Sequence, residues 1–159
     1  AKALGLKHAN LAVPGAMADD VARLQVVPAM ALRPRYVTMF IGGNDLVHGR
    51  APEAYAADLA FAVGRVSEME TRVLVLNLPD VWRAPRFVDK PDRDVTPERV
   101  RAFNAATADV AKTYKAMLVD ISGPDLVAPE MMSSDGFHPG PRWHVLVAER
   151  VSAAAQARR

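Results

Sequence analysis

Cysteine is missing from this sequence, which excludes disulfide bonds and thiol catalysis. The compartment stays open, because secreted proteins need not contain disulfides. An excess of one charge is also missing: the chain has 20 Lys and Arg against 18 Asp and Glu, and the basic residues are scattered. We therefore expect no nucleic-acid partner. No apolar run approaches the roughly 20 residues that a transmembrane helix needs, so we expect no membrane span.

Two kinds of ligand signature are absent as well. The sequence has no G-x-G-x-x-G and no P-loop, so a dinucleotide- or phosphate-binding protein is set aside. No cluster of His, Asp and Glu has the spacing of metal ligands. His8 and His48 have no carboxylate at a useful spacing and are interpreted as surface or core residues. We expect neither a metal nor a cofactor.

The chain does contain an alternation of short β-rich runs and longer helical patterns, which is typical of βαβ units around a parallel sheet. With 159 residues, half of them apolar, we expect a single domain over residues 1–159. Pro28 should kink or end the first helix, while Thr96 and Pro97 should begin the third. The predicted strands are residues 8–13, 36–41, 73–76 and 117–121, and the predicted helices are residues 18–32, 53–70, 97–115 and 142–157.

A short turn before the last predicted helix carries an acid and a base. Asp135 stands three residues before His138, so its carboxylate can accept the Nδ1 proton of the imidazole and leave Nε2 free to take a proton from a nucleophile. Pro139 stiffens the chain directly after the histidine. An isolated Asp-x-x-His is more often a simple turn with a surface histidine, so its interpretation depends on what accompanies it.

Two further segments accompany this turn. Residues 41–45 read Ile-Gly-Gly-Asn-Asp, and residues 10–16 read Asn-Leu-Ala-Val-Pro-Gly-Ala. Gly15, Asn44 and His138 each come after a predicted strand, and open α/β sheets bind ligands beyond the carboxyl ends of parallel strands. In this order the three segments resemble three of the four sequence blocks of the SGNH (GDSL) hydrolases, a family of serine esterases, lipases and acyl hydrolases.

The resemblance implies a fold and a set of roles. The fold would be a flavodoxin-like three-layer α/β/α sandwich whose parallel strands have the order 2-1-3-4-5. His138 would act as base and later as acid, and Asp135 would orient its ring. The Gly15 backbone N–H and the Asn44 side chain would stabilise the oxyanion formed from a small-molecule ester, and Asp45 would hydrogen-bond its own loop. No metal or cofactor is implied.

The fourth block of the family is a strand that ends in Gly-Asp-Ser, and this sequence has none. Residues 1–6 instead resemble the end of the helix that follows the nucleophile in the family. We therefore expect that the chain lacks the first strand, that the serine lies upstream, and that the chain alone is inactive. The expected partner is the N-terminal fragment of the same protein, present as a separate chain. None of the serines has the family's context; they are Ser67, Ser122, Ser133, Ser134 and Ser152.

The long segment of residues 78–95 is expected to be a loop that shapes the substrate site. Trp82 and Phe87 either line an acyl or alcohol pocket or anchor this loop to the core, and the sequence favours neither. Asn104 and His144 are interpreted as structural. The alternative function is a non-catalytic carbohydrate- or lipid-binding relative that has lost its serine. The presence of all the base and oxyanion residues argues against that alternative.

Overall fold

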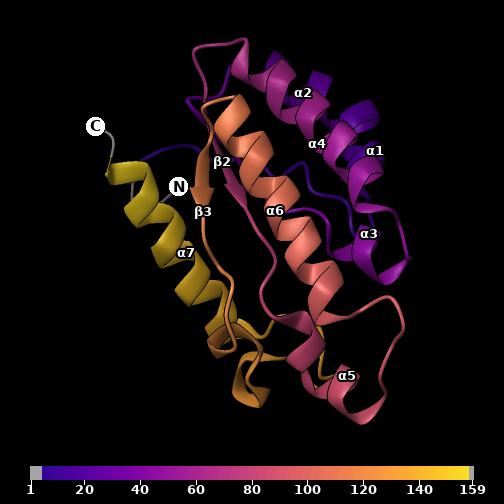
Figure 1. Ribbon diagram of the computed structural model, residues 1–159. Helices are drawn as coiled ribbons and strands as arrows, with labels where there is room; N and C mark the ends of the chain where they lie inside the picture. The colour runs from indigo at the N-terminus through magenta and orange to yellow at the C-terminus, as the bar shows by residue number, and fades with distance from the viewer. Residues whose placement is uncertain (1–4, 158–159) are drawn as a thin grey trace.

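Three parallel strands form the sheet of the computed structural model, which describes residues 5–157 (Figure 1). The strands are β1 (Tyr36–Met39), β2 (Arg72–Leu76) and β3 (Met117–Val119). Their order is β1-β2-β3, so β2 is central. Because the strands are parallel, their carboxyl ends meet at one edge of the sheet.

Helices flank the sheet on both sides. In chain order they are α1 (Ala18–Asp20), the π-helical turn η2 (Val21–Gln25), α2 (Val26–Ala31), α3 (Gly43–Val47), α4 (Pro52–Ser67), α5 (Pro85–Asp89), α6 (Pro97–Thr113) and α7 (Pro141–Gln156). Figure 1 shows α7 on one face and α4 and α6 on the other, so the architecture is a three-layer α/β/α arrangement. Among the described residues, no helix combines the length and the apolarity needed to cross a membrane.

The composition of β2 explains why both faces are covered. Successive residues of a strand point to opposite faces, and β2 is apolar at every position after Arg72. Val75 lies in the cluster that contains Val63 of α4, whereas Leu74 lies in the cluster that contains Trp143 of α7. A strand that is apolar on both faces is stable only when both are buried, as in parallel sheets generally.

Most of the predicted elements are confirmed. The strands predicted from the second run onward are β1, β2 and β3, and the last three predicted helices are α4, α6 and α7. α6 begins as predicted, because the Thr96 hydroxyl oxygen accepts a hydrogen bond from the Arg99 N–H at 3.2 Å. Pro97 fills the first helical position, where no N–H is needed.

The sequence predicts that Pro28 kinks or ends the first helix, but the helical segment does not end there. Pro28 lies inside α2, which continues to Ala31. The distortion comes one turn earlier, in η2, where the Val26 N–H donates to the Val21 carbonyl five residues back. A proline has no N–H to offer the carbonyl four residues before it, and a widened turn is a common way to accommodate that gap.

The strand predicted at residues 8–13 is wrong for the described structure. These residues belong to no strand and are mostly exposed; Val13 is 59% exposed. A strand needs a neighbour for its N–H and C=O groups. Within residues 5–157, β1 has a partner only on its β2 side. The other edge of β1 is unpaired among these residues. Phe40, the residue after the end of β1, is 43% exposed.

Residues 78–95 are less irregular than the predicted loop. They contain a 3₁₀ turn, Val81–Arg83, as well as α5. Asn104 of α6 fixes the start of the segment, because its side chain accepts from the Leu78 N–H at 2.7 Å and donates to the Leu78 carbonyl at 2.8 Å. Asn104 thus does for Leu78 what a neighbouring strand would do, which agrees with its predicted structural role.

Candidate active site

The residues singled out in the sequence form two groups, each held by hydrogen bonds. Asp135 and His138 lie in the connection between β3 and α7. Asn44 lies in α3, just after β1, and is bonded to the loop that contains Gly15. Both connections leave carboxyl ends of strands, the edge at which open α/β sheets bind ligands. No hydrogen bond among residues 5–157 joins one group directly to the other.

Asp135 and His138 make the contact that the sequence predicts. Oδ2 of Asp135 lies 2.5 Å from Nδ1 of His138, and Oδ1 accepts from the backbone N–H groups of His138 at 2.9 Å and Phe137 at 3.0 Å. The hydrogen bond from the His138 ring, followed by those two backbone bonds, holds the pKa of Asp135 well below its ordinary value. An ionised carboxylate only accepts, so Nδ1 carries the ring proton. In the neutral ring Nε2 is then a free acceptor.

The turn around this pair is closed by its own backbone. The Ser133 N–H donates to the His138 carbonyl at 2.7 Å, and the Gly136 N–H donates to the Ser133 carbonyl at 2.9 Å. Gly136 has a φ of +70°, and a Cβ there would lie 3.0 Å from the backbone nitrogen of Arg86. That nitrogen also donates to the Gly136 carbonyl at 3.1 Å, so α5 braces the turn.

Two aromatic side chains pack against the same turn. The Phe137 ring lies 5.0 Å from the His138 ring and 5.1 Å, edge to face, from the Phe87 ring. Phe87 is only 5% exposed, whereas the His138 side chain is 70% exposed. The burial of Phe87 favours the anchoring interpretation over a place in a substrate pocket.

Trp82 lies at a hollow of about 520 Å³ near the start of α6. The guanidinium of Arg83 lies 4.3 Å from the centre of its ring. The same side chain also packs against the core, so both interpretations of Trp82 have a structural counterpart. The other residues that line this hollow are Asn77, Asp80, Arg83, Pro97, Val100, Arg101, Asn104, Ser122 and Gly123.

Gly15 lies in an exposed turn. The Ala16 N–H donates to the Val13 carbonyl at 3.2 Å, which closes a four-residue turn with Pro14 and Gly15 at its centre. The φ of Gly15 is +81°, the value that the third position of a type II turn requires and that glycine adopts without strain. Its N–H makes no hydrogen bond within the described part of the chain and is available to a ligand.

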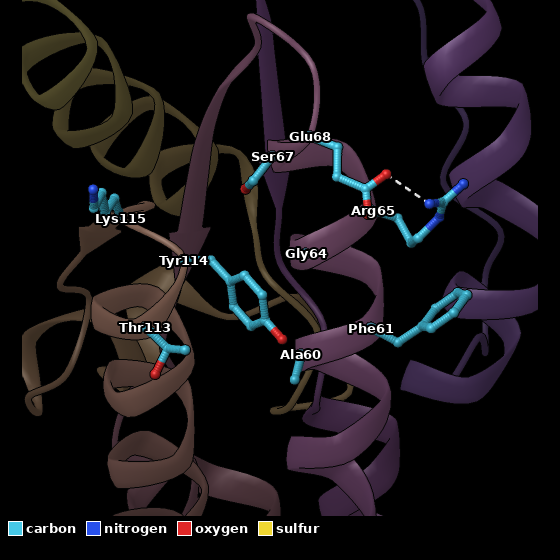
Figure 2. Close-up of a pocket in the computed structure, with 9 residues that line it drawn as sticks. All are labelled: Ala60, Phe61, Gly64, Arg65, Ser67, Glu68, Thr113, Tyr114 and Lys115. Carbon is cyan, nitrogen blue, oxygen red and sulfur yellow. Dashed lines mark hydrogen bonds and ion pairs between the residues drawn. The ribbon is translucent and has the colours of Figure 1, made fainter.

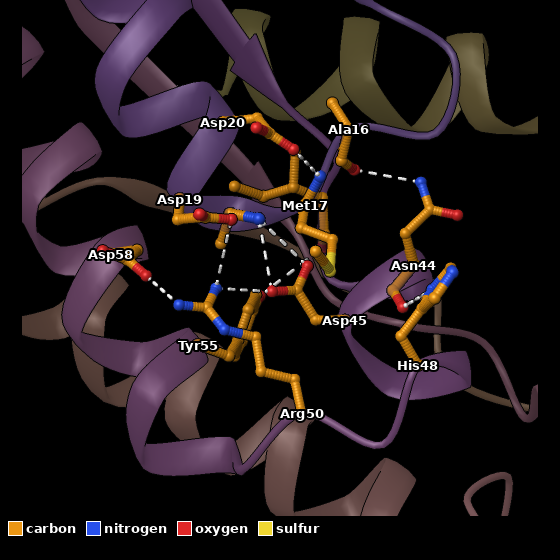
Figure 3. Close-up of polar contacts among 12 residues, drawn as sticks. Ala16, Met17, Asp19, Asp20, Asn44, Asp45, His48, Arg50, Tyr55 and Asp58 are labelled. Carbon is orange, nitrogen blue, oxygen red and sulfur yellow. Dashed lines mark hydrogen bonds and ion pairs between the residues drawn. The ribbon is translucent and has the colours of Figure 1, made fainter.

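Asn44 is oriented by the backbone of that neighbouring turn. Its Nδ2 donates to the Ala16 carbonyl at 3.0 Å, which leaves the second Nδ2 proton free (Figure 3). Gly42 precedes α3 with a φ of +108°, and a Cβ there would lie 2.9 Å from the Tyr55 ring. Tyr55 is fully buried under this turn and donates to the Ile41 carbonyl at 3.4 Å. Burial is the main cause that raises its pKa to about 12.

A charged network next to Asn44 was only partly visible in the sequence. Asp45 is fully buried, and its two carboxylate oxygens lie 3.2 and 3.0 Å from the Ala18 nitrogen (Figure 3). Arg50 donates to Asp45 at 2.8 Å and to Asp58. The hydrogen bond to Asp45 is the largest cause of a raised pKa at Arg50. The sequence predicts that Asp45 hydrogen-bonds its own loop, whereas its carboxylate reaches Ala18 at the start of α1. No local pattern marks Arg50 as its other partner.

A second hollow lies at the opposite end of the sheet. It measures about 470 Å³ and is formed where α4 and α6 end, before β2 and β3 begin (Figure 2). Gly64 lets the Tyr114 ring lie against α4, because a Cβ there would be 2.8 Å from that ring. None of the predicted site residues lines this hollow. Among the described residues, no group of three or more His, Asp or Glu side chains could hold a metal ion.

Several solved structures share this fold. The lipase/acylhydrolase from Enterococcus faecalis has a TM-score of 0.76 at 20% identity, and the match covers 99% of this chain and 80% of that one. TesA has a TM-score of 0.75 at 22% identity, over 95% of this chain and 78% of that one. The psychrotrophic esterase EstA from Pseudoalteromonas sp. has a TM-score of 0.73 at 14% identity, over 94% and 76%. At these identities the likeness establishes the fold.

Among curated proteins, no relative matches the sequence. The comparison with protein families is more informative, because the model of one family matches residues 1–146. That span contains Gly15, Asn44, Asp135 and His138. The fold of the solved structures agrees with it. The chain belongs to the GDSL-like lipase/acylhydrolase family.

Proposed function

We propose that the protein hydrolyses carboxylic esters through a Ser-His-Asp triad, with His138 and Asp135 as two of its members. The observation that supports this most directly is the Asp135–His138 pair, in which Nδ1 is bonded to a carboxylate and Nε2 is free and exposed. That arrangement suits a general base. Ester hydrolysis also needs hydrogen-bond donors for the oxyanion. Asn44 and Gly15 can supply them, since each has a donor proton that no other described group uses.

The reaction follows from these groups. Nε2 of His138 removes the hydroxyl proton of a serine while the serine oxygen attacks the ester carbonyl, and Asp135 stabilises the imidazolium that results. The Gly15 N–H and the free Nδ2 proton of Asn44 donate to the oxyanion. The tetrahedral intermediate collapses, and the alcohol leaves with the proton from Nε2. Nε2 of His138 then takes a proton from a water molecule while the water oxygen attacks the acyl-serine. The second tetrahedral intermediate collapses, the serine oxygen leaves with that proton, and the acid is released.

The nucleophile is the group that the described residues do not supply. Ser133 is near in sequence, but its hydroxyl donates to the Pro139 carbonyl at 3.1 Å. Within residues 5–157, no serine hydroxyl bonds to Nε2 of His138. We place the nucleophile on a strand upstream of this sequence that ends in Gly-Asp-Ser. The partner that carries it is the N-terminal part of the same protein, and the present chain is inactive without it.

The open edge of β1 supports this placement. In the family's strand order 2-1-3-4-5, the upstream strand would be strand 1, residues 8–13 would be strand 2, and β1 of this structure would be strand 3. The upstream strand would therefore lie between residues 8–13 and β1. It would pair with the unpartnered edge of β1 and give residues 8–13 a neighbour, which explains why they form no strand alone. Each buried N–H or C=O group left without a partner costs about 1–3 kcal/mol, so filling this position would also stabilise the sheet.

The test is hydrolysis of p-nitrophenyl acetate by the protein with its upstream segment, beside residues 1–159 alone. We expect turnover only when the upstream segment is present, and we expect His138→Ala to abolish it. His144→Ala is the matched control, because His144 is an exposed histidine of α7 with no carboxylate partner among residues 5–157. Undiminished turnover in a folded His138→Ala variant would remove His138 as the base. Binding of sugars or lipids without any turnover would favour the non-catalytic alternative.

A further inference from the structure

A buried carboxylate ties the Gly15 turn to the helix that carries Asn44. Asp45 is fully buried, yet its oxygens are bonded on two sides: by the Ala18 N–H, 27 residues earlier in the chain, and by the guanidinium of Arg50. Ala18 begins α1 and follows the turn by only two residues. The position of the carboxylate therefore fixes the distance between α3 and the Gly15 turn.

Arg50 is the group that holds this carboxylate. Its Nη1 donates to Asp45 at 2.8 Å and its Nη2 to Asp58 of α4, so the planar guanidinium spans two carboxylates (Figure 3). Asp19 of α1 lies 3.8 Å from the same Nη1. The backbone around Arg50 is also held, because the Arg99 side chain donates to its carbonyl at 2.8 Å. The Arg50 side chain is 23% exposed, whereas the carboxylate of Asp45 is fully buried.

The network acts on Asn44 through the backbone of the turn. The Ala16 carbonyl accepts one Nδ2 proton of Asn44 at 3.0 Å and thereby sets the direction of the other proton. The same short segment, residues 16–18, is tied to Asp45 at its far end. A shift of Asp45 would move this segment, and with it both the Asn44 amide and the Gly15 N–H. The two proposed oxyanion donors thus share one support.

We propose that Arg50 is a positioning residue of the oxyanion hole, which acts through Asp45 and the segment of residues 16–18 on Asn44 and Gly15. The inference rests on the proposed esterase function. Arg50 touches no reacting atom in this scheme. Its part is to keep the carboxylate of Asp45 in one place, and a two-point guanidinium contact does this better than a single point charge can.

The first measurement is the rate of ester hydrolysis by the protein with its upstream segment. A loss of donor alignment lowers the rate of the chemical step more than substrate binding. We expect Arg50→Ala to lower kcat about tenfold to a hundredfold, the size of effect that a small misplacement of catalytic groups produces, with KM nearly unchanged. Arg50→Lys should recover part of the loss, because it restores one charge contact to Asp45. Asp58→Asn should act in the same direction more weakly.

The matched control is Arg65→Ala, which removes an arginine from an ion pair with Glu68 at the other end of α4. We expect this variant to keep the wild-type kcat. A second measurement follows the Asn44 side-chain amide by NMR without substrate. Arg50→Ala should bring its two Hδ2 resonances closer together and speed their exchange with water, and Arg65→Ala should not.

The outcomes separate the two proposals. If Arg50→Ala folds and its Asn44 resonances and kcat equal those of the Arg65→Ala control, the positioning role is overturned. A variant that only melts earlier, with unchanged Asn44 resonances, also overturns it, because that is the behaviour of a purely structural ion pair. If the wild-type protein turns over no ester, the proposed function fails. The Asn44 resonances then still decide whether Arg50 orients this side chain.

Discussion

The two halves of the candidate site are built in opposite ways. The Asp135–His138 turn is exposed, and most of its hydrogen bonds join residues no more than five positions apart. The Asn44 half surrounds the fully buried Asp45, and the bonds that tie α3 to residues 16–18 join residues 27 and 28 positions apart. A turn closed mainly by local bonds depends less on the rest of the fold than a site held by distant partners. Substitutions should therefore separate activity from stability in the first half and couple them in the second.

After the loss expected for His138→Ala, the next largest effect is expected on turnover at Asp135. In Asp135→Asn the new amide can donate to Nδ1 of His138, which moves the ring proton to Nε2 and removes the free acceptor. We expect kcat to fall by up to about 10⁴-fold with little change in KM. The melting temperature should change little, because the side chain is exposed. Ser134→Ala is the neighbouring control. A change mainly in KM would mean that Asp135 contacts the substrate instead.

The second effect concerns Asn44, where both consequences should appear together. Asn44→Ala removes one oxyanion donor, so we expect kcat to fall about a hundredfold to a thousandfold. It also leaves the Ala16 carbonyl without its partner, so a small loss of stability should accompany the loss of rate. Steady-state kinetics and urea unfolding of the same samples check both. Full activity would mean that backbone donors alone form the hole.

Asp45 should show the coupling in its stability. Asp45→Ala leaves the buried Ala18 N–H without an acceptor, which costs about 1–3 kcal/mol of unfolding free energy. Arg50 keeps Asp58, so a fully unpaired charge is not expected. Glu68→Ala, which breaks the exposed pair with Arg65, is the control and should cost no more than about 1 kcal/mol. Equal losses in the two variants would contradict the proposed importance of the Asp45 network.

Two glycines give the smallest and sharpest comparison. Gly136 and Gly15 both have positive φ, of +70° and +81°, so an alanine at either costs about 1–2 kcal/mol of backbone strain. A Cβ at Gly15 would meet open space, whereas one at Gly136 would lie 3.0 Å from the Arg86 nitrogen. We expect Gly136→Ala to be the more destabilising of the two by thermal unfolding. The reverse order would show that α5 yields at no cost.

How much the sequence could predict depends on the range of the contacts. Thr96 and Pro97 mark the start of α6 correctly because a helix cap lies within four residues. The Asp135–His138 contact can be predicted from the sequence for the same reason, because its partners lie three residues apart. Arg50 was not found, since its partnership with Asp58 depends on how α3 and α4 pack. The prediction of a strand at residues 8–13 is wrong for the described residues, because a strand needs a neighbouring strand and the residue pattern does not show whether one is present.

The open edge of β1 has a consequence for how the polypeptide behaves in solution. Among residues 5–157 one edge of β1 is a row of unpaired backbone groups, and such an edge is a template for any other strand, including one from another copy. Residues 1–159 kept apart from the proposed upstream strand should self-associate edge to edge, and light scattering that rises with protein concentration would report it. A peptide with the sequence of that strand should compete for the edge and suppress the scattering. The position that we assign to the nucleophile would then also be the position that keeps the protein monomeric.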